Sequence, residues 1–355
     1  MAATRLGKVT MRLGVLSYTN TASGVGCFAR DIVDNLPVDS YFSVDCVKGQ
    51  ERWMERQVNG MPERELFTRY LDKFKPDIVV GIETMFSRCV YEVTRRRGVR
   101  TVLVVMHESY LEGKHDPDWY LCPVRAAWNR VGTANKVYFD WPTDLRPFPF
   151  SERTEARKFL HVMGYASGAR AGASGFNRRQ TRAVYEGFCS IQNPDISLVV
   201  HCQEDWRKEY GECHDPRVTF RLENLSKPAD VYEGFDVLVQ PDSYAGYNRV
   251  LLEAKACGLP VLTTDGPPMN ELVTDADALI PCRAEWYDFR KQGQKWGPMC
   301  YRYLVKAEDV AAAIERSLTW DIPAKSRRAR MCAEKHDWTD EKRADCIRLL
   351  EMMCH

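Results

Sequence analysis

Short apolar runs and segments of helical periodicity alternate along this chain. The runs in its first half occupy residues 13–16, 41–47, 78–82, 101–106 and 137–139. Apolar residues recur at helical spacing over residues 28–36, 64–74 and 86–96. Runs rich in β-branched residues predict buried strands, and the helical period predicts amphipathic helices. Because strands and helices alternate, the pattern predicts an α/β fold. Residues 116–130 are expected to form a loop followed by a helix.

The second half of the chain repeats this alternation. Strands are predicted at residues 159–163, 197–201, 218–221, 237–239 and 261–264. Helices are predicted at residues 181–191, 250–257, 308–320, 326–335 and 341–354. Residues 140–150 are rich in proline and aromatic side chains, which favours a boundary between domains there. We therefore expect domains at residues 1–150 and 151–335, with a last segment, 336–355, whose helix packs back toward the first domain. Residues 283–300 resemble an insertion.

One unit of the second half has the clearest internal order. A predicted strand at residues 237–239 is stopped by Pro241, and small residues follow at 243–246. A helix then runs to Gly258, a typical C-terminal cap, with Pro260 just beyond. A helix after such a turn directs free backbone N–H groups toward an anion, such as a pyrophosphate. The unit therefore predicts an anion site at the start of this helix.

The end of this unit resembles a known signature. Glu253 to Val261 reads Glu-Ala-Lys-Ala-Cys-Gly-Leu-Pro-Val. It is similar to the donor-site motif Glu-Ala-x-Ala-x-Gly-x-Pro-Val of the retaining, family-four (group 1) GT-B glycosyltransferases. That resemblance implies two facing Rossmann-like domains with the active-site cleft between them. It also implies that Glu253 holds the ribose of a nucleotide. The alternative is that Glu253 is an exposed helix residue in an ordinary Rossmann-like unit.

The first half of the motif departs from the family. Gly246 and Tyr247 fit the pattern, and they are assigned to donor binding together with Asn248, which stands where a glycine is usual. Ala245 occupies the position of the family's first glutamate, which contacts the donor sugar. The resemblance therefore supports nucleotide binding and leaves the contact to the sugar open.

Two adjacent arginines precede the predicted helix at residues 181–191. Arg178 and Arg179 follow a stretch rich in Gly, Ala and Ser, residues 164–175. The dipole disfavours cations at a helix start, so the pair indicates a bound anion. Arg179 aligns with a lysine common in the family, and we assign it a catalytic role in stabilising the leaving diphosphate, with Arg178 in donor binding. A solvated helix start is the alternative.

Three residues of the first domain are candidates for the site. Gly24 and Gly26 lie in a polar loop between a strand and a helix, as in the opening of a Rossmann-like half. In the resembled family this loop faces the donor phosphates and the acceptor, so residues 1–150 are the expected acceptor-side domain; a tight turn is the alternative for the two glycines. His107 follows the strand at 101–106. The family commonly has a histidine there that faces the donor sugar, so His107 is a candidate catalytic residue, unless it only caps the strand end.

Composition narrows the class of protein. The chain has 355 residues and a net charge of +1, which neither demands nor excludes nucleic acid. Its 13 cysteines show no Cys-x-x-Cys pairing and suit a reducing compartment. No apolar run approaches the ~18 residues that span a bilayer, and the segment before Met11 is too short and polar for a signal peptide. We expect a cytoplasmic protein.

Several charged clusters are further candidate sites. Asp275 and Asp277 match the Asp-x-Asp metal motif of another glycosyltransferase class, but they stand in a turn, and no metal is expected. The run at residues 95–97 and the segment at 327–330 are rich in arginine. Such runs are phosphate patches or solvated helix ends.

The expected function follows from the resemblance. We expect a hexosyl- or pentosyltransferase that moves a sugar from a nucleoside-diphosphate sugar to an acceptor hydroxyl, with retention of anomeric configuration. No cofactor is expected beyond the donor substrate. The acceptor is left open between a soluble metabolite, a glycan and a hydroxymethylated base in phage-type DNA. The alternative is a non-catalytic nucleotide-sugar-binding protein, or a sugar-nucleotide epimerase with the GT-B fold.

Overall fold

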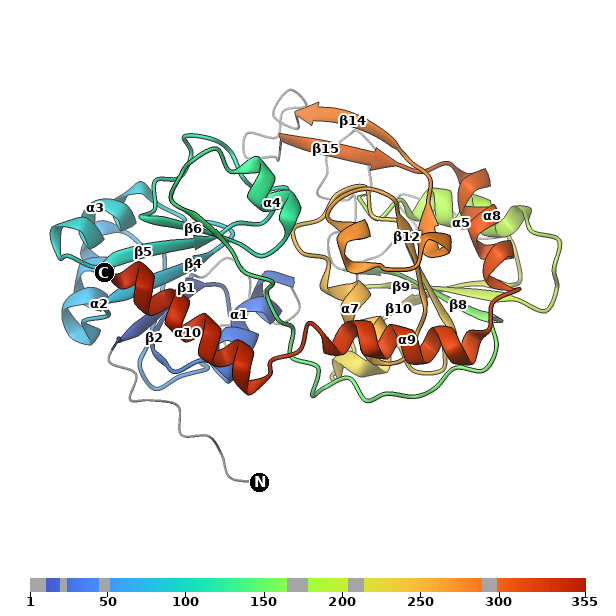
Figure 1. Ribbon diagram of the computed structural model, residues 1–355, viewed down its shortest axis with the longest axis horizontal. Helices are drawn as coiled ribbons and strands as arrows, with labels where there is room; N and C mark the ends of the chain where they lie inside the picture. The colour runs from blue at the N-terminus through green and yellow to red at the C-terminus, as the bar shows by residue number, and fades with distance from the viewer. Residues whose placement is uncertain (1–10, 20–23, 45–51, 165–177, 204–213, 289–298) are drawn as a thin grey trace. The chain divides into compact units, whose positions relative to one another are not determined.

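The computed structural model describes residues 11–19, 24–44, 52–164, 178–203, 214–288 and 299–355 (Figure 1). The chain divides into two compact units. Unit 1 comprises residues 1–143 and 338–355, and unit 2 comprises residues 144–337. The expected domains were 1–150 and 151–335. Of the expected last segment, 336–355, residues 338–355 belong to unit 1. Each unit is described by itself.

Unit 1 contains a parallel sheet with the strand order β3-β2-β1-β4-β5-β6-β7. Its strands are β1 (Leu13–Ser17), β2 (Val38–Ser43), β3 (Gln57–Asn59), β4 (Ile78–Ile82), β5 (Arg100–Val104), β6 (Trp119–Cys122) and β7 (Lys136–Tyr138). Its helices are α1 (Gly24–Asn35), α2 (Arg64–Phe74), α3 (Arg88–Arg96), α4 (Arg125–Arg130) and α10 (Asp340–Cys354). Along the chain, successive strands are added on one side of β1 (β2, then β3) and on the opposite side of β4 (β5, β6, then β7). The topological switch point, where such sheets bind ligands, therefore lies between these two strands.

Aromatic side chains fill much of the core of unit 1. Phe42 on β2 packs against Phe67 and Tyr70 of α2, with ring centroids 5.2 and 5.4 Å apart. All three side chains are fully buried. Helix α10 joins this unit through the chain segment before it, where Trp338 contacts Trp141 edge to face at 5.6 Å. These contacts bring the end of the chain back to its first unit.

Unit 2 also has a parallel sheet, with the strand order β10-β9-β8-β11-β12-β13. Its strands are β8 (Lys158–Gly164), β9 (Ser197–Cys202), β10 (Val218–Leu222), β11 (Val237–Gln240), β12 (Val261–Thr264) and β13 (Leu279–Ile280). The α-helices are α5 (Thr181–Ser190), α7 (Arg249–Ala256), α8 (Ala307–Ser317) and α9 (Ile322–Glu334). Short 3₁₀ turns are η2 (Pro228–Val231), η3 (Met269–Leu272) and η4 (Ala276–Ala278). The switch point of this unit lies between β8 and β11.

The two sheets confirm the predicted α/β class with two Rossmann-like units, although some segments differ from the prediction. Residues 119–122, expected to be loop or helix, form strand β6. The carboxylate of Asp118 accepts hydrogen bonds from the backbone N–H and the hydroxyl of Thr101, and these bonds hold β6 beside β5. The insertion near residue 283 contains an antiparallel pair, β14 (Arg283–Asp288) and β15 (Met299–Leu304). Within the described ranges, no helix is long and apolar enough to cross a membrane.

Candidate functional site at the switch point of unit 2

Two loops meet at the carboxyl ends of β8 and β11. The backbone N–H and the hydroxyl of Ser243, after β11, donate to the carbonyl of Arg178 at 2.7 and 3.1 Å. Arg179 donates from Nη1 to Oδ2 of Asp242 at 2.5 Å. The predicted pair of arginines therefore lies directly beside the turn that leads into α7. The glycine-rich stretch predicted before them lies outside the described residues, apart from Gly164.

The two arginines differ in their charged neighbours. Burial lowers the pKa of Arg179, and the neighbouring Asp242 carboxylate opposes that effect. The Arg179 side chain is 11% exposed and Asp242 is fully buried, so the two charges neutralise each other inside the unit. Arg178 has no carboxylate partner among the described residues, and its buried Nε has no hydrogen bond there. Arg178 is therefore the better placed of the two to meet an anion, while a catalytic role for Arg179 stays a prediction.

The start of helix α7 carries a second polar group without a partner. Asn248 caps this helix in the left-handed conformation, with φ of 62°. It is only 8% exposed, and neither its Oδ1 nor its Nδ2 has a hydrogen-bond partner in the described part of the chain. A buried amide without partners costs free energy, which a bound ligand would recover. The free backbone N–H groups of the helix start lie at the same place.

The turn before Asn248 is buried and largely apolar. Ala245 is 2% exposed and Tyr247 is 4% exposed, and Gly246 between them is also buried. Gly246 and Tyr247 thus lie in the predicted turn, next to Asn248. Because Ala245 carries only a methyl group, this turn supplies no carboxylate for a donor sugar.

Glu253 is held by two neighbours one turn further along α7. Its Oε1 accepts from Arg249 Nε at 3.0 Å, and its Oε2 accepts from the hydroxyl of Tyr232 at 2.7 Å. Burial and the adjacent carboxylate raise the pKa of Tyr232 well above its usual range, so its hydroxyl stays a donor. A carboxylate can accept about four hydrogen bonds, so Glu253 keeps capacity for a ligand while its orientation is fixed.

A family comparison bears on this same region. Residues 176–289 match the family model described as glycosyl transferases group 1. These residues form a group 1 glycosyltransferase domain. They include Arg178 and Arg179, the turn after β11 and helix α7, and so the predicted donor-binding residues of unit 2. A sequence search of curated proteins finds no match to the chain.

Solved structures resemble the whole chain in fold. Sucrose-phosphate synthase from Thermosynechococcus elongatus matches with a TM-score of 0.70 at 13% identity, covering 96% of this chain and 98% of that one. A glycosyltransferase from Rickettsia africae ESF-5 matches with a TM-score of 0.62 at 10% identity, covering 97% and 98%. UDP-GlcNAc 2-epimerase from Neisseria meningitidis matches with a TM-score of 0.52 at 10% identity, covering 96% of this chain and 99% of that one. At these identities the likeness shows the GT-B fold, and with the group 1 domain it indicates a glycosyltransferase.

The first-unit candidates lie apart in the sequence from the group 1 domain. Helix α1 begins at Gly24, so Gly24 and Gly26 lie in its first turn. The prediction that these two glycines lie in a loop before the helix was therefore wrong. Gly24 is exposed and Gly26 is buried. His107 follows β5, is 8% exposed, and has a buried Nδ1 without a partner among the described residues. Burial first, and then Arg130, lowers its pKa to about 4, so the imidazole is neutral at pH 7.

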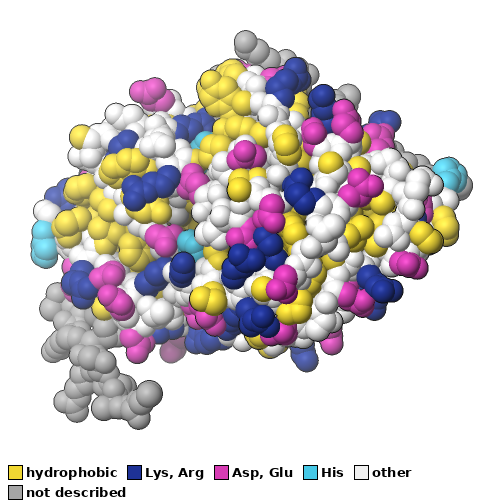
Figure 2. All heavy atoms as spheres, turned by 45° about the vertical axis from the view of Figure 1, so that its right-hand side comes forward, with side chains coloured by type: hydrophobic (Ala, Val, Ile, Leu, Met, Phe, Trp, Pro, Cys, Tyr) yellow, Lys and Arg dark blue, Asp and Glu magenta, His cyan; other side chains and the backbone are white. Residues whose placement is uncertain are grey.

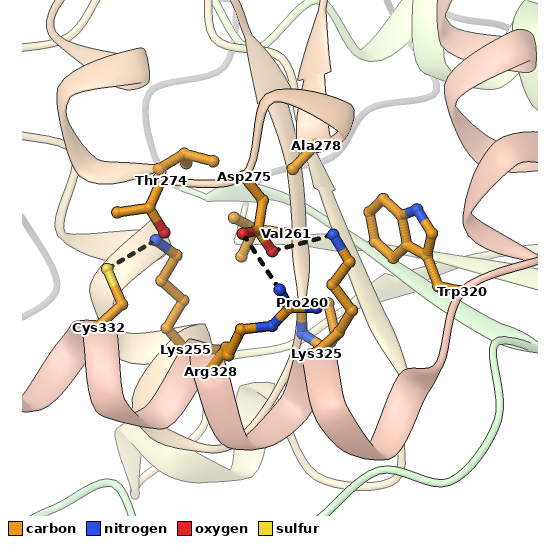
Figure 3. Close-up of a pocket in the computed structure, with 12 residues that line it drawn as sticks. Lys255, Pro260, Val261, Thr274, Asp275, Ala278, Trp320, Lys325, Arg328 and Cys332 are labelled. Atoms are coloured by element: carbon orange, nitrogen blue, oxygen red, sulfur yellow. Dashed lines mark hydrogen bonds and ion pairs between the residues drawn. The ribbon is translucent and has the colours of Figure 1, made fainter.

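The Asp-x-Asp motif is engaged by a lysine. Lys325 Nζ contacts Asp275 Oδ2 at 3.0 Å, beside a small pocket that Trp320 also lines (Figure 3). The same Nζ contacts Asp277 Oδ1 at 2.6 Å. The two carboxylates therefore tie this turn to α9. In the part of the chain that the structure describes, no group of three or more His, Cys, Asp or Glu side chains is arranged to hold a metal ion.

Two arginines of the run at residues 95–97 in unit 1 are paired with carboxylates, and a pocket places Arg97 away from the carboxyl ends of the strands. Arg95 contacts Asp116 at 2.6 Å, and Arg97 contacts Asp72 at 2.7 Å. Arg97 lines a pocket together with Arg12 at the start of β1, which is the opposite edge of the sheet. Figure 2 likewise shows basic side chains interspersed with acidic ones over the face it presents. The run therefore does not form a phosphate patch at the switch point.

Sequence reasoning missed three residues of the site. Asp242, Tyr232 and Arg249 hold Arg179 and Glu253 in place. The spacing of Arg249 and Glu253, four residues apart on a helix, was a readable signal for their ion pair. Asp242 also follows a strand at the ligand-binding edge of the sheet. No local pattern pointed to Tyr232.

Proposed function

We propose that the protein transfers a hexosyl or pentosyl group from a nucleoside-diphosphate sugar to an acceptor hydroxyl, with retention of anomeric configuration. The bond between C1 of the sugar and the diphosphate oxygen breaks, and its electron pair stays on the diphosphate. C1 forms a bond to the acceptor oxygen, whose proton is released. The chemistry therefore requires stabilisation of the negative charge that develops on the leaving diphosphate.

The proposal rests on the anion site at the start of α7. Asn248 presents a buried amide without partners there, and Arg178 presents a guanidinium without a carboxylate partner among the described residues. Preorganised donors of this kind stabilise a developing charge without having to reorganise. In this assignment Arg178 and the amide of Asn248 meet the diphosphate, and Arg179 supports the loop through its pair with Asp242.

Glu253 is assigned to the ribose of the donor. Tyr232 and Arg249 each occupy one of its oxygens and fix the carboxylate at the side of α7. The remaining lone pairs accept hydrogen bonds from the two ribose hydroxyls. This role deepens the group 1 assignment of residues 176–289, because it uses the motif that the family shares.

Ala245 favours a second candidate function. Without a carboxylate at that position, the donor sugar loses one contact, and the second candidate is a sugar-nucleotide epimerase. The products of the reaction distinguish a transferase from an epimerase. An epimerase converts the donor without an acceptor and leaves the nucleotide attached, whereas a transferase or its hydrolytic side reaction releases the free nucleoside diphosphate.

The test is a donor screen with three matched variants. Wild-type protein is incubated with UDP-, GDP- and ADP-sugars, and released diphosphate is measured; release of none of them would contradict the proposal. Binding of the matching diphosphate is then measured by calorimetry. Arg178→Ala is expected to weaken binding by about 1.5–3 kcal/mol, the scale of charge-assisted hydrogen bonds. Arg182→Ala is the control, because that side chain is 80% exposed on α5.

Arg179→Ala separates structure from binding in the same experiment. This variant leaves Asp242 buried and unpaired, so we expect the free energy of unfolding to fall by about 3–5 kcal/mol. Arg178→Ala is expected to leave it unchanged. The opposite pattern, with a stability loss only for Arg178→Ala, would reverse the assignment of the two arginines.

Metal independence is part of the same proposal. Lys325 occupies both carboxylates of the Asp-x-Asp motif, and Arg178 offers positive charge at the diphosphate position. Diphosphate release is therefore expected to continue in EDTA. Loss of activity in EDTA that manganese restores would instead assign Asp275 and Asp277 to a metal ion.

A further inference from the structure

Gln180, two residues after Arg178, connects three segments of unit 2 through its side chain. It stands at the N-cap of α5 and is only 9% exposed. Its Nε2 donates to the carbonyl of Pro241 at 2.5 Å and to the carbonyl of Tyr303 at 3.0 Å. Its Oε1 accepts from the backbone N–H of Val305 at 2.9 Å. One buried amide therefore joins the loop before α5, the turn after β11 and the end of β15.

The same three segments also contact one another through backbone groups. The N–H of Tyr303 donates to the carbonyl of Ser243 at 2.7 Å, and the N–H of Ser243 donates to the carbonyl of Arg178 at 2.7 Å. The end of β15, which leads into α8, is thereby fixed beside the turn after β11 (Figure 1). This end of β15 lies beyond residues 176–289, so the match to the group 1 family does not include it.

The backbone of Gln180 has a conformation that favours glycine. Its φ is 54°, in the left-handed region that residues with a Cβ rarely adopt. Glycine would relieve this strain but would lose all three hydrogen bonds of the side chain. Both N–H groups of the amide are already engaged within unit 2, so none is left to donate to a ligand. Gln180 therefore acts through the groups that it holds, and not by contact with a substrate.

We propose that Gln180 is the positioning residue that brings Arg178 and Asn248 to the same diphosphate. This inference rests on the proposed function, which assigns both of these side chains to the diphosphate of the donor. Arg178 lies on the loop that ends in Gln180, and Asn248 ends the turn that begins at Pro241, which the amide holds. Without the amide, the loop and the turn are joined less firmly, so the two donors no longer converge on one anion.

A double-mutant cycle measures whether Gln180 acts through Arg178. Calorimetry with UDP, GDP and ADP first identifies the diphosphate that the wild-type protein binds most tightly. Its affinity is then measured for Gln180→Met, Arg178→Ala and the double variant. Methionine keeps a long, flexible side chain and removes the hydrogen bonds. Gln180→Gly is measured as well, because it removes the amide and also relieves the positive φ.

The matched control is a buried amide of unit 1. The side chain of Asn35 also makes three hydrogen bonds, one donated to the carbonyl of Asp31 and two accepted from Arg343. Asn35→Leu therefore removes a comparable set of contacts in the other unit. It is expected to lower the melting temperature and to leave the affinity for the diphosphate at its wild-type value.

The expected result is a coupling between the two substitutions. Both Gln180 variants should weaken binding of the diphosphate by about tenfold. Arg178→Ala should weaken binding by about tenfold or more in the wild-type protein but by about threefold or less beside Gln180→Met, because the arginine is no longer in place there. If Gln180 only stabilised the fold, Arg178→Ala would have the same effect in both backgrounds.

Amide hydrogen exchange tests the inference in the wild-type protein. The backbone N–H groups of Tyr303 and Val305 belong to the network around Gln180, and in this assignment neither touches the diphosphate. A saturating concentration of the diphosphate should slow the exchange of both groups by about tenfold, because local opening at the end of β15 would disturb the bound state. The exchange of Thr319, in the turn after α8, should stay unchanged.

Three outcomes would overturn the inference alone. They are wild-type affinity in both Gln180 variants, an equal effect of Arg178→Ala in the two backgrounds, and unchanged exchange at Tyr303 and Val305 when the diphosphate binds. The exchange measurement decides the matter if neither Gln180 variant folds. A wild-type protein that binds none of the three diphosphates would instead remove the proposed function, and this inference with it.

Discussion

Burial, more than any charged neighbour, sets the protonation of three histidines. His107, His115 and His161 each have a pKa lowered to about 4, with burial as the largest cause. His161 is satisfied by Val239 and Thr181, at 2.7 and 2.8 Å. All three imidazoles are therefore neutral at pH 7, and any role of His107 in the reaction is that of a neutral hydrogen-bonding group.

This burial predicts a dependence of stability on pH. The pKa of His107 in the folded chain, about 4, lies below its ordinary value of 6.5. The contribution of the neutral His107 to the free energy of unfolding is fully present above pH 6.5. It is lost as the pH falls toward 4, because between these two pH values only the unfolded chain binds a proton at this histidine. Urea unfolding of wild type and His107→Gln at pH 7 and 5 measures the difference. Between pH 7 and pH 5, the free energy of unfolding of the variant is expected to fall by about 2 kcal/mol less than that of wild type. An equal fall in both proteins would show that His107 is not buried.

Asn248 allows strain and binding to be separated at a single residue. Asn248→Gly keeps the left-handed cap and removes the buried amide, so we expect diphosphate binding to weaken about tenfold while the urea midpoint stays the same or rises. Asn248→Ala should weaken binding equally and also cost about 1 kcal/mol of stability, since alanine resists a positive φ. Calorimetry and urea unfolding measure the two effects. Wild-type affinity in both variants would remove Asn248 from the site.

The local sequence pattern identified which residues belong to the candidate site, but not which neighbours they contact. The adjacency of Arg178 and Arg179 at a helix start was readable from sequence. Which of them is neutralised depends on Asp242, 63 residues further along the chain, and no local period reports that contact. The conformation of Asn248 was equally hidden, because asparagine adopts the left-handed region only where its surroundings require it.

At the scale of elements, helices α5 and α8 pack at a glycine. A Cβ added to Gly187 would lie 2.4 Å from the carbonyl oxygen of Ala307 and 3.2 Å from Cβ of Val310. Backbone atoms move less readily than side chains, so the two helices would have to separate. The close approach of these helices is thus set by one missing methyl group.

Gly187→Ala is therefore expected to be destabilising in spite of alanine's higher helix propensity. The free energy of unfolding should fall by about 1–3 kcal/mol, as in other overpacked interiors. Chemical denaturation measures this change. Gly24→Ala in α1 is the control, because no atom lies within 4 Å of its added methyl group. An unchanged midpoint for Gly187→Ala would mean that α5 and α8 are packed more loosely than described.

Elements with strong local signals were predicted well. The bounds of α2, β4 and β12 match their predicted ranges, and each combines a clear period with punctuation by proline, glycine or charge. Strand β6 was missed because its four residues are too few to show a period. Its pairing depends on Asp118 and Thr101, which are 17 residues apart. The pattern therefore fails where a short strand is placed by its neighbours in the sheet.

At the scale of the whole molecule, unit 2 is inserted within unit 1. The chain leaves unit 1 after Thr143 and returns at Trp338. The two ends of unit 2 are joined by a hydrogen bond from Leu145 N–H to Asp337 Oδ1 at 3.1 Å. Insertions of this kind tolerate excision, because their termini are close together and their core is their own.

Residues 144–337 expressed alone are therefore expected to fold. The fragment should unfold cooperatively on heating and bind the nucleoside diphosphate of the full chain's donor, because the residues that we assign to that donor, Arg178, Asn248 and Glu253, all lie inside unit 2. Circular dichroism and calorimetry measure the two properties. A fragment without a cooperative transition would show that unit 2 depends on unit 1 for its fold.

The return of the chain at Trp338 has a consequence for protein synthesis. Helix α10 buries Cys346, Ile347, Leu350 and Met353 in unit 1, and Arg343 donates to the side chain of Asn35 in α1 at 2.9 Å. The ribosome makes all of unit 2 before this helix exists. The usual N-terminal-first order of co-translational folding is thereby reversed: unit 2 reaches its final structure while unit 1 still exposes the apolar surface that α10 will cover. Chaperones that bind nascent chains should therefore hold the first unit longest, although it is the first to leave the ribosome.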